Sequence, residues 1–300
     1  MADPRPGIAA GLTLYRPDWP IFEALLDRLL DQANAVFVVV DGPIGEAIEA
    51  VHLARLRARE GVTLLDLRAN AGIATGLNRL VEAARNAGFG RLVLFDQDSE
   101  VEEGLVCRLE EGSATLRHRG FEVAVIGPRP VAAPGSRTRA PRYRPRGERV
   151  GDLTAVDFVI VSGSLVDLRI AERIGPFDES LRMDGVDVEW GFRAWAKGSA
   201  VFVHEGTQLN HRVGTGLVQV GPIAFPRQSQ NRMENYVRSQ ILLACMRHVP
   251  LRWKLRSLLY VPLQCIAFAL DSGRPLQVLR RLSRAGLASA RSRPPKDHRL

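Results

Sequence analysis

The sequence predicts an α/β fold in which a mostly parallel, mixed sheet is flanked by helices and followed by a basic helical extension. Short apolar runs rich in β-formers alternate with helical patterns through the first half of the 300 residues, which is typical of strands joined by covering helices. Beyond Arg232 the pattern is helical and rich in arginine. Hydrophobic residues make up 46% of the chain, enough for a substantial buried core.

The first half is expected to alternate strands and helices in a regular order. Strands are predicted at residues 8–15, 36–40, 62–67, 91–95 and 123–127. Helices are predicted at residues 20–33, 46–59, 76–88 and 102–119. No internal repeat interrupts this order.

The second half opens with residues 132–151, where periodicity is lost and prolines and arginines accumulate, so we predict a mobile basic loop. The elements expected after it are a strand at 155–162, helices at 166–174 and 185–198, a strand at 200–204 and a loop at 214–231. We therefore predict an α/β domain of residues 1–231, a helical extension of residues 232–290 and a disordered tail of residues 291–300.

Charge and cysteine content narrow the class of protein. The net charge of +8 and the pI near 10.1 favour an anionic partner such as nucleic acid, a lipid surface or a phosphorylated substrate. The three cysteines are scattered, which argues against a zinc knuckle or disulfide framework and fits a reducing cytosol. We see no secretory signal and no run near the roughly 20 apolar residues of a membrane span.

Asp96 and Asp98 follow an apolar strand and form the first candidate site. Ligands of open α/β sheets bind beyond the carboxyl ends of strands, and alternation directs these two carboxylates to the same side. A hard divalent ion shared with substrate phosphates suits such a pair. The alternative is a polar cap after the strand.

Two further segments follow strands and could contact a nucleotide. Asp41 could accept hydrogen bonds from a nucleobase, or it could be an ordinary turn residue before Gly42. The small residues between Asn70 and Asn78 would let a ligand approach the backbone at a helix N-terminus. The alternative for this segment is a glycine-rich turn with an asparagine cap.

Asp184, Asp187, Glu189 and Trp190 form a dense acidic group beside an aromatic residue. This combination suits a general base and a platform on which a sugar stacks, although Asp187 could instead be a plain N-cap. His211 adds an imidazole after the last predicted strand of this part; a lone histidine is usually structural.

Taken in order, these motifs resemble the inverting GT-A-fold glycosyltransferases of family 2, especially the bacterial rhamnosyltransferase-like branch. The resemblance runs from Ile8 to about Gly214. The motifs that carry it are Tyr15-Arg16-Pro17, Asp41, Asn70-x-Gly72 with Asn78, Asp96-Gln97-Asp98-Ser99, Ser162-Gly163-Ser164 and the segments 174–179, 184–190 and 211–214.

The resemblance implies a role for each matching residue. The donor nucleotide would be bound by Thr13, Tyr15, Asp41, Asn70, Gly72, Asn78, Asp96 and Gln97. The metal ligands would be Asp98 and His211, the catalytic base would be Asp187, and the acceptor side would include Asp184, Glu189 and Trp190. One departure concerns the nucleobase: the family usually has a polar Asn-x-Ser turn where this chain has Gly42-Pro43-Ile44.

The implied reaction is a metal-dependent, inverting sugar transfer in cell-surface polysaccharide synthesis. The cofactor would be Mg²⁺ or Mn²⁺, and the donor a dTDP- or UDP-linked sugar, with L-rhamnose favoured. The acceptor would be a glycan, free or linked to a polyprenyl diphosphate.

The basic extension suggests where the reaction takes place. Apolar and basic residues at helical spacing between Asn235 and Ala290 predict an amphipathic helix pair on an anionic membrane. The chain would then be cytoplasmic and peripheral to the inner face of the plasma membrane. The alternative is a helical subdomain that packs on the core or forms a homo-oligomer. The arginines of residues 137–149 could cover diphosphates or could simply be solvated.

Three other functions compete with this one. A sugar nucleotidyltransferase would carry a glycine-rich basic loop after the first strand, where this chain has Tyr15-Arg16-Pro17. Nucleic-acid binding is suggested by charge alone, and no RNP-like aromatic stripe supports it, so we expect no nucleic-acid partner. A non-catalytic nucleotide-sugar sensor is disfavoured by the presence of Asp98, Asp187 and His211.

Overall fold

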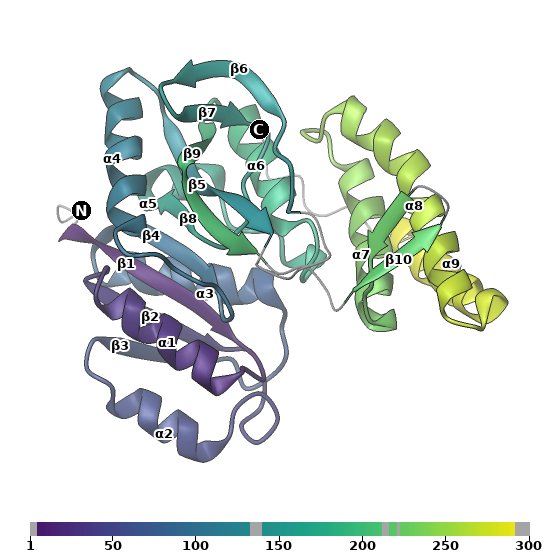
Figure 1. Ribbon diagram of the computed structural model, residues 1–300, viewed down its shortest axis with the longest axis horizontal. Helices are drawn as coiled ribbons and strands as arrows, with labels where there is room; N and C mark the ends of the chain where they lie inside the picture. The colour runs from purple at the N-terminus through teal and green to yellow at the C-terminus, as the bar shows by residue number, and fades with distance from the viewer. Residues whose placement is uncertain (1–4, 133–139, 212–215, 221–222, 292–300) are drawn as a thin grey trace.

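The computed structural model describes residues 5–132, 140–211, 216–220 and 223–291. For residues 5, 6, 211, 220, 223, 224, 226, 290 and 291 only the backbone is described. The described strands form a nine-stranded mixed sheet in the order β3-β2-β1-β4-β8-β5-β9-β7-β6 and a separate hairpin, β10-β11. Helices cover both faces of the sheet, and α7, α8 and α9 stand to one side with the hairpin (Figure 1). The predicted fold class is confirmed.

The strands and helices have these bounds. The strands are β1 (Arg5–Leu14), β2 (Ala35–Val40), β3 (Val62–Asp66), β4 (Phe89–Asp96), β5 (Val123–Ala132), β6 (Pro145–Val150), β7 (Leu153–Val156), β8 (Ser164–Asp167), β9 (Ala200–His211), β10 (Leu217–Val220) and β11 (Ile223–Pro226). The α-helices are α1 (Trp19–Leu30), α2 (Ala50–Ala58), α3 (Ile73–Asn86), α4 (Leu105–His118), α5 (Leu168–Ile174), α6 (Val186–Ala196), α7 (Gln230–Cys245), α8 (Leu251–Asp271) and α9 (Pro275–Arg291), and a 3-10 turn, η1, spans Glu179–Leu181.

Side-chain alternation along the strands divides the core into two layers. Phe37 and Val39 of β2 point to the layer covered by α3, α5 and α6, whereas Val38 and Val40 point to the layer covered by α1 and α4. Both layers are apolar because successive side chains of a strand face opposite sides of the sheet. A parallel strand covered on both faces is therefore a continuous hydrophobic run.

The register of the central strands brings their carboxyl ends to one edge. β1 pairs in parallel with β2 and β4. Thr13 is opposite Asp96, and Leu14 is opposite Val40. The residues that follow β1, β2 and β4 therefore emerge side by side.

Several predicted elements in the second half were wrong in extent. Of the strand expected at 155–162 only residues 155–156 are strand, as the end of β7, and residues 157–163 form a connection that turns at Gly163, which has φ of 80° and lies against Pro128. The next strand, β8, begins at Ser164 and takes the first residues of the helix predicted at 166–174. β6 lies within the predicted loop of residues 132–151, and its mostly exposed edge position leaves no hydrophobic alternation to detect. Residues 133–139 of that loop lie outside the described part of the chain.

The remaining differences concern β9 and the segment after it. The strand predicted at 200–204 continues to His211, because β9 goes on pairing with β5 beyond a register shift at Arg129. The added part is mostly polar, so the sequence pattern did not indicate it. The predicted loop at 214–231 contains the β10-β11 hairpin, whose Val218 and Phe225 pack on α8. Neither strand is long enough to show a clear period.

The helical extension consists of three described helices rather than a pair. α7, α8 and α9 share a small apolar cluster that includes Met233, Ala269 and Leu282. α7 also supplies Leu243 to the main core, and Trp253 of α8 packs edge-on against Phe192, with ring centroids 5.5 Å apart. The extension therefore packs on the α/β core as well as on itself.

We expect Leu243→Ala to lower the free energy of unfolding of the whole chain by about 2–5 kcal/mol, because Leu243 is fully buried between α7 and the core. Leu259→Ala is the matched control, since Leu259 on α8 is 72% exposed, and its effect should stay within about 0.5 kcal/mol. Chemical denaturation of both variants measures the difference. Equal stabilities would show that α7 does not pack on the core.

Candidate active site

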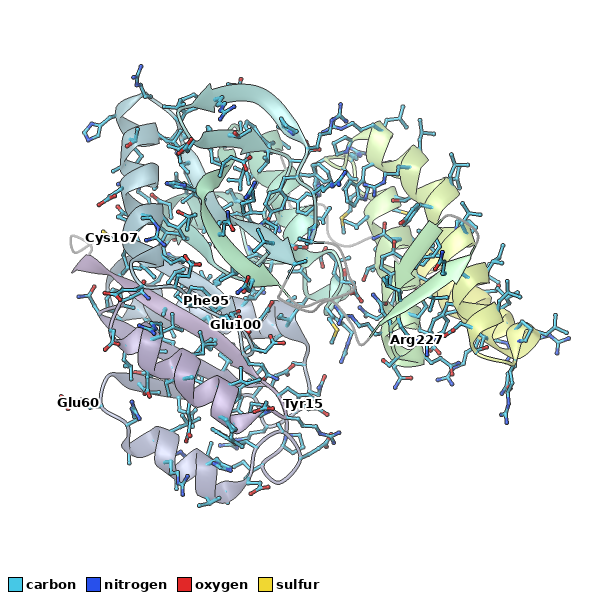
Figure 2. The ribbon with its side chains drawn as sticks, in the orientation of Figure 1. Tyr15, Glu60, Phe95, Glu100, Cys107 and Arg227 are labelled. Carbon is cyan, nitrogen blue, oxygen red and sulfur yellow. The ribbon has the colours of Figure 1, made fainter. Side chains whose placement is uncertain are left out.

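The site lies at the edge where β1, β2 and β4 end. Tyr15 follows β1, and Phe95 and Glu100 flank the Asp96–Asp98 segment after β4 (Figure 2). Asp41 follows β2 and is 5% exposed. The structure thus brings the candidate residues of three strands to one edge, where open α/β sheets bind ligands.

Asp41 anchors the turn that the sequence predicted as nucleotide-binding. Its carboxylate accepts hydrogen bonds from the backbone N–H groups of Ala71, at 2.7 Å, and Gly72, at 3.1 Å. A carboxylate can accept about four hydrogen bonds, so these contacts leave capacity for a ligand. The nucleobase role of Asp41 stays a prediction.

Gly72 holds this turn against the segment that leads into α6. It has φ of 95°, and a Cβ there would lie 2.9 Å from the backbone oxygen of Arg182. That same oxygen accepts a hydrogen bond from Ala74 N at 3.1 Å, and the Arg182 guanidinium donates to the backbone oxygen of Asn70 at 3.2 Å. Only glycine allows this close approach without strain, which couples the 70–74 turn to the start of α6.

Gln97 positions the backbone after β1. Its side-chain oxygen accepts from Tyr15 N at 2.8 Å, and its side-chain nitrogen donates to Tyr15 O at 3.0 Å. Thr13 lies beside it on β1, and its buried hydroxyl has no partner among the described residues. Gln97 therefore shapes the predicted nucleotide wall through Tyr15, whereas the buried Thr13 hydroxyl lies against Gly76 of α3, and its role in donor binding stays a prediction.

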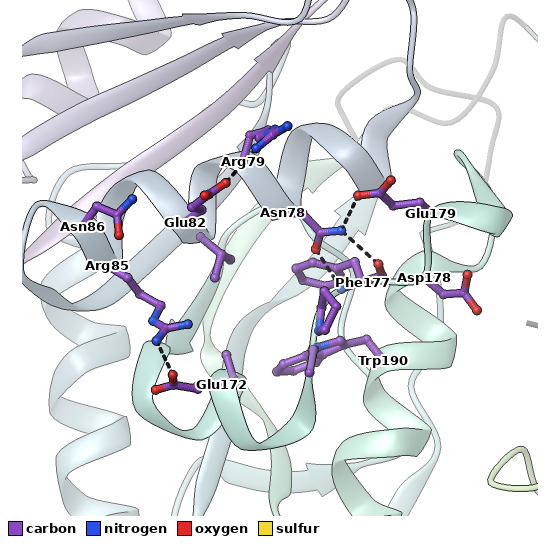
Figure 3. A pocket seen from close by; sticks show the side chains of 14 residues that line it. Asn78, Arg79, Glu82, Arg85, Asn86, Glu172, Phe177, Asp178, Glu179 and Trp190 are labelled. Carbon is purple, nitrogen blue, oxygen red and sulfur yellow. Dashed lines mark hydrogen bonds and ion pairs between the residues drawn. The ribbon is translucent and has the colours of Figure 1, made fainter. Parts of the chain in front are cut away.

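Asn78 and Trp190 lie away from this edge, along a groove of about 720 Å³ between α3 and residues 171–179 (Figure 3). Asn78 hydrogen-bonds the backbone N and O of Phe177 at 2.8 and 3.0 Å. Trp190 is 3% exposed and donates to Gly175 O at 3.1 Å. Both side chains are engaged in joining α3 and α6 to this loop, so we no longer assign them to donor or acceptor binding.

Glu189 is also an interior residue, although the sequence suggested an acceptor contact. It is 1% exposed, and its carboxylate accepts from Arg193 Nε at 2.8 Å and lies 2.8 Å from His248 Nε2. Burial opposes ionisation, but the hydrogen bonds from His248 and Arg193 lower the pKa of Glu189 overall. Glu189 thus pairs α6 with the segment after α7 and offers almost no surface to an acceptor.

Asp187 lies in the first turn of α6, close to the carboxylates after β4. Burial raises its pKa to about 6, partly offset by hydrogen bonds from backbone N–H groups, including that of Val188 at 2.8 Å. Burial, followed by repulsion from Asp98 and Asp187, raises the pKa of Asp96 to about 6. Asp184 adds a further negative charge near Asp187. The four carboxylates form one electrostatically coupled group.

Arg232 is a cation near these carboxylates that the sequence did not single out. It lowers the pKa of Asp96, and its Nε lies 3.6 Å from Asp184 Oδ1. Arg182, which braces the 70–74 turn, was missed as well. Arg232 comes from α7, which is distant in sequence, and Arg182 precedes the 184–190 segment without belonging to its motif, so only proximity in the fold identifies them.

The residues after β4 fit a divalent cation. Asp96 and Asp98 repel each other, and carboxylate oxygens are preferred ligands of Mg²⁺ and Mn²⁺. The backbone of His211 follows Asn210, whose side chain donates to Glu100 at 3.0 Å, two residues beyond Asp98. Within the described side chains, which exclude His211, no three His, Cys, Asp or Glu groups are placed to hold a metal.

Comparisons with known proteins bear on this site. The chain is 27% identical over 264 residues to the dTDP-rhamnosyl transferase RfbF of Shigella flexneri, covering 84% of this chain and 85% of the relative. No family model matches the sequence.

Solved structures share the fold. Residues 1–349 of S. aureus TarS superpose with a TM-score of 0.55 at 11% identity, covering 95% of this chain and 89% of TarS. TarS is also known with UDP-GlcNAc, at a TM-score of 0.51 and 13% identity, again covering 95% and 89%. GalNAc-T7 with UDP, GalNAc and Mn²⁺ has a TM-score of 0.57 at 11% identity over 77% of this chain, which spans about half (47%) of GalNAc-T7.

These findings confirm the resemblance that the motifs predicted. The chain has the fold of the GT-A glycosyltransferases, and its enzyme class is that of a glycosyltransferase. Within that class its sequence is similar to a rhamnosyltransferase.

We expect Glu189→Gln to lower the free energy of unfolding by about 3–5 kcal/mol, because it leaves the buried Arg193 charge without its partner. The control is Glu82→Gln, which removes an exposed ion pair with Arg79 and should cost less than about 1 kcal/mol. Denaturant unfolding measures both. A loss of acceptor affinity with unchanged stability would instead return Glu189 to the acceptor site.

Proposed function

We propose that this glycosyltransferase transfers a sugar, with inversion, from a nucleoside diphosphate to a hydroxyl of a glycan or lipid-linked glycan. The observation that carries the proposal is the position of Asp187, which lies close enough to Asp96 at the strand edge to raise the pKa of that carboxyl. The pKa of Asp187 is itself raised by burial, to about 6. A carboxylate whose pKa is close to neutral is suited to general-base catalysis.

Asp187 would accept the proton of the acceptor hydroxyl as its oxygen attacks the anomeric carbon. The bond from that carbon to the diphosphate oxygen breaks with its electron pair, and in-line displacement inverts the configuration. Asp184 would lie on the acceptor side of this base. No covalent enzyme intermediate is needed.

The donor would lie along the edge formed by Thr13, Tyr15, Asp41, the Asn70–Gly72 turn and Asp96. The Shigella relative supports L-rhamnose carried by dTDP, whereas the TarS complexes leave a UDP-sugar as the alternative. Mg²⁺ or Mn²⁺ would be held by Asp98 and His211, and the Mn²⁺ of GalNAc-T7 supports this choice. When bound, the metal would supply positive charge for the leaving diphosphate.

We expect Asp187→Asn to keep nucleotide binding and to lose at least about 10²-fold in kcat, because the amide cannot take the proton. In the wild type, kcat/KM should rise as the pH increases through about 6, since the base works only when deprotonated. Asp27→Asn, at an exposed aspartate on α1, is the matched control and should keep that rise. Near-normal turnover of Asp187→Asn would remove Asp187 from the role.

We also propose that the helical extension, residues 232–290, attaches the catalytic domain, residues 1–231, to an anionic membrane surface. One helix carries a continuous set of exposed apolar side chains, the α8 stripe: Leu251, Leu255, Leu258, Leu259, Leu263, Ile266 and Leu270. Basic side chains accompany it on α7, α8 and α9, among them Arg238, Lys254, Arg280 and Arg284. Among the described residues no helix has the length and hydropathy to cross a bilayer, so the contact would be interfacial.

Flotation with liposomes tests the membrane proposal. We expect the chain to float with anionic vesicles, more weakly at high salt, and not with zwitterionic vesicles. Leu258→Gln combined with Leu259→Gln should abolish flotation, whereas Val51→Gln, at a 54% exposed position on α2, should not. If the wild type does not bind anionic vesicles, the membrane proposal is wrong. The alternative is then a helical extension that packs on the core or forms a homo-oligomer.

A further inference from the structure

A second cavity lies between the start of α6 and the helical extension. It has a volume of about 260 Å³. Its lining includes Asp184, Gln228, Tyr236, Trp253, Arg256 and Tyr260. Three of these six side chains are aromatic. Two of the three, Trp253 and Tyr260, come from α8, one before and one after Arg256.

α8 has two faces of different chemistry. Trp253, Arg256 and Tyr260 follow one another at spacings of three and four residues, which places them on one helix face. The leucines of the α8 stripe lie on the exposed side. Core contacts with Phe158 and Phe192 hold the ring of Trp253, which leaves Arg256 as the charged group of this face that core packing does not explain.

Within the described part of the chain, Arg256 is a cation that lies over aromatic rings and has no acidic partner. Its guanidinium lies over the rings of Trp253, at 5.6 Å, and Tyr260, at 5.5 Å. No ion pair is found for it among the described residues, whereas Arg232 and Arg252 pair with Asp184 and Asp157. An arginine fixed by aromatic rings and left unpaired is ready to bind an anionic group.

Other polar groups of the cavity also lack partners. Trp253 Nε1, a donor, and Gln228 Oε1, an acceptor, are buried and have no hydrogen-bond partner within the described residues. Burial raises the pKa of Tyr236, so its hydroxyl keeps its proton and can donate. Buried groups of this kind are costly unless a ligand or water satisfies them. Aromatic faces with a few converging donors and acceptors are suited to a sugar ring, which has apolar faces and a rim of hydroxyls.

The cavity adjoins the proposed catalytic base. Asp184, Gly185 and Val188 line it, and Asp187 lies between them in the first turn of α6. Asp187 itself is not among the lining residues, so a ring held in the cavity would have to direct its reacting hydroxyl towards the first turn of α6.

We propose that this cavity is the acceptor subsite, and that it binds a sugar ring bearing an anionic group, with Arg256 on that group and the aromatic side chains around the ring. The inference rests on the proposed glycosyltransferase function and deepens it: the acceptor is an anionic glycoconjugate rather than a neutral glycan. Tyr236 and Gln228 would then act as specificity-determining residues for the ring.

Ligand-observed NMR on the full chain tests this subsite. The probes are the 1-phosphates of L-rhamnose, glucose, galactose and N-acetylglucosamine, each beside its methyl glycoside, with dTDP and UDP in excess to occupy the donor site. We expect at least one sugar phosphate to bind, and more tightly than its methyl glycoside. Arg256→Gln should weaken that phosphate about tenfold and leave the methyl glycoside unchanged.

Arg57→Gln, at an exposed arginine on α2 outside the cavity, is the matched control and should bind as the wild type does. Tyr236→Phe should weaken both kinds of probe without altering nucleotide affinity. Binding of no sugar phosphate to the wild type, or equal binding by Arg256→Gln, would overturn the subsite. Nucleotide binding and donor hydrolysis, measured on the same samples, report separately on the proposed function.

Discussion

Repulsion among carboxylates at one sheet edge is the constraint on which the rest of the site depends. Parallel pairing of β1, β2 and β4 brings their carboxyl ends together, and α6 adds Asp187 next to Asp96 and Asp98. Like charges in a partly dry site raise one another's pKa. Arg232 offsets only part of this charge. An edge of this kind is best stabilised when it holds a cation and leaves one carboxylate able to take up a proton.

Backbone contacts then fix the positions of the groups around that edge. Asp41 holds the 71–72 amides, Gly72 lies against Arg182, and Gln97 holds both backbone polar groups of Tyr15. These contacts are local and rigid, so a bound nucleotide would find its wall already formed. On the other side, the helical extension lines the cavity that Asp184 borders, so the proposed membrane attachment and the proposed acceptor subsite would belong to the same unit.

The first half of the fold was predictable because most of its strands are buried apolar runs and each helix has its own period. β6, β10 and β11 were not, since short edge strands and hairpins leave no alternation, and their pairing depends on distant partners. The carboxylates at strand ends could be found by the same reasoning. The sequence suggested Glu189 and Trp190 as acceptor residues because residue type does not reveal burial. Both are buried on the inner side of α6, whereas Asp187 faces the sheet edge.

The most direct test of the central claim is a panel of dTDP- and UDP-linked sugars incubated with Mn²⁺, with Mg²⁺ or with a chelator, and scored for nucleoside diphosphate release. The account predicts release from one donor, dependent on metal and lost in Asp98→Asn. Asp27→Asn, at an exposed aspartate on α1 paired with Arg59, should behave as the wild type does. Release that is unaffected by chelator and by Asp98→Asn, or no release and no metal-dependent binding for any donor, would contradict it.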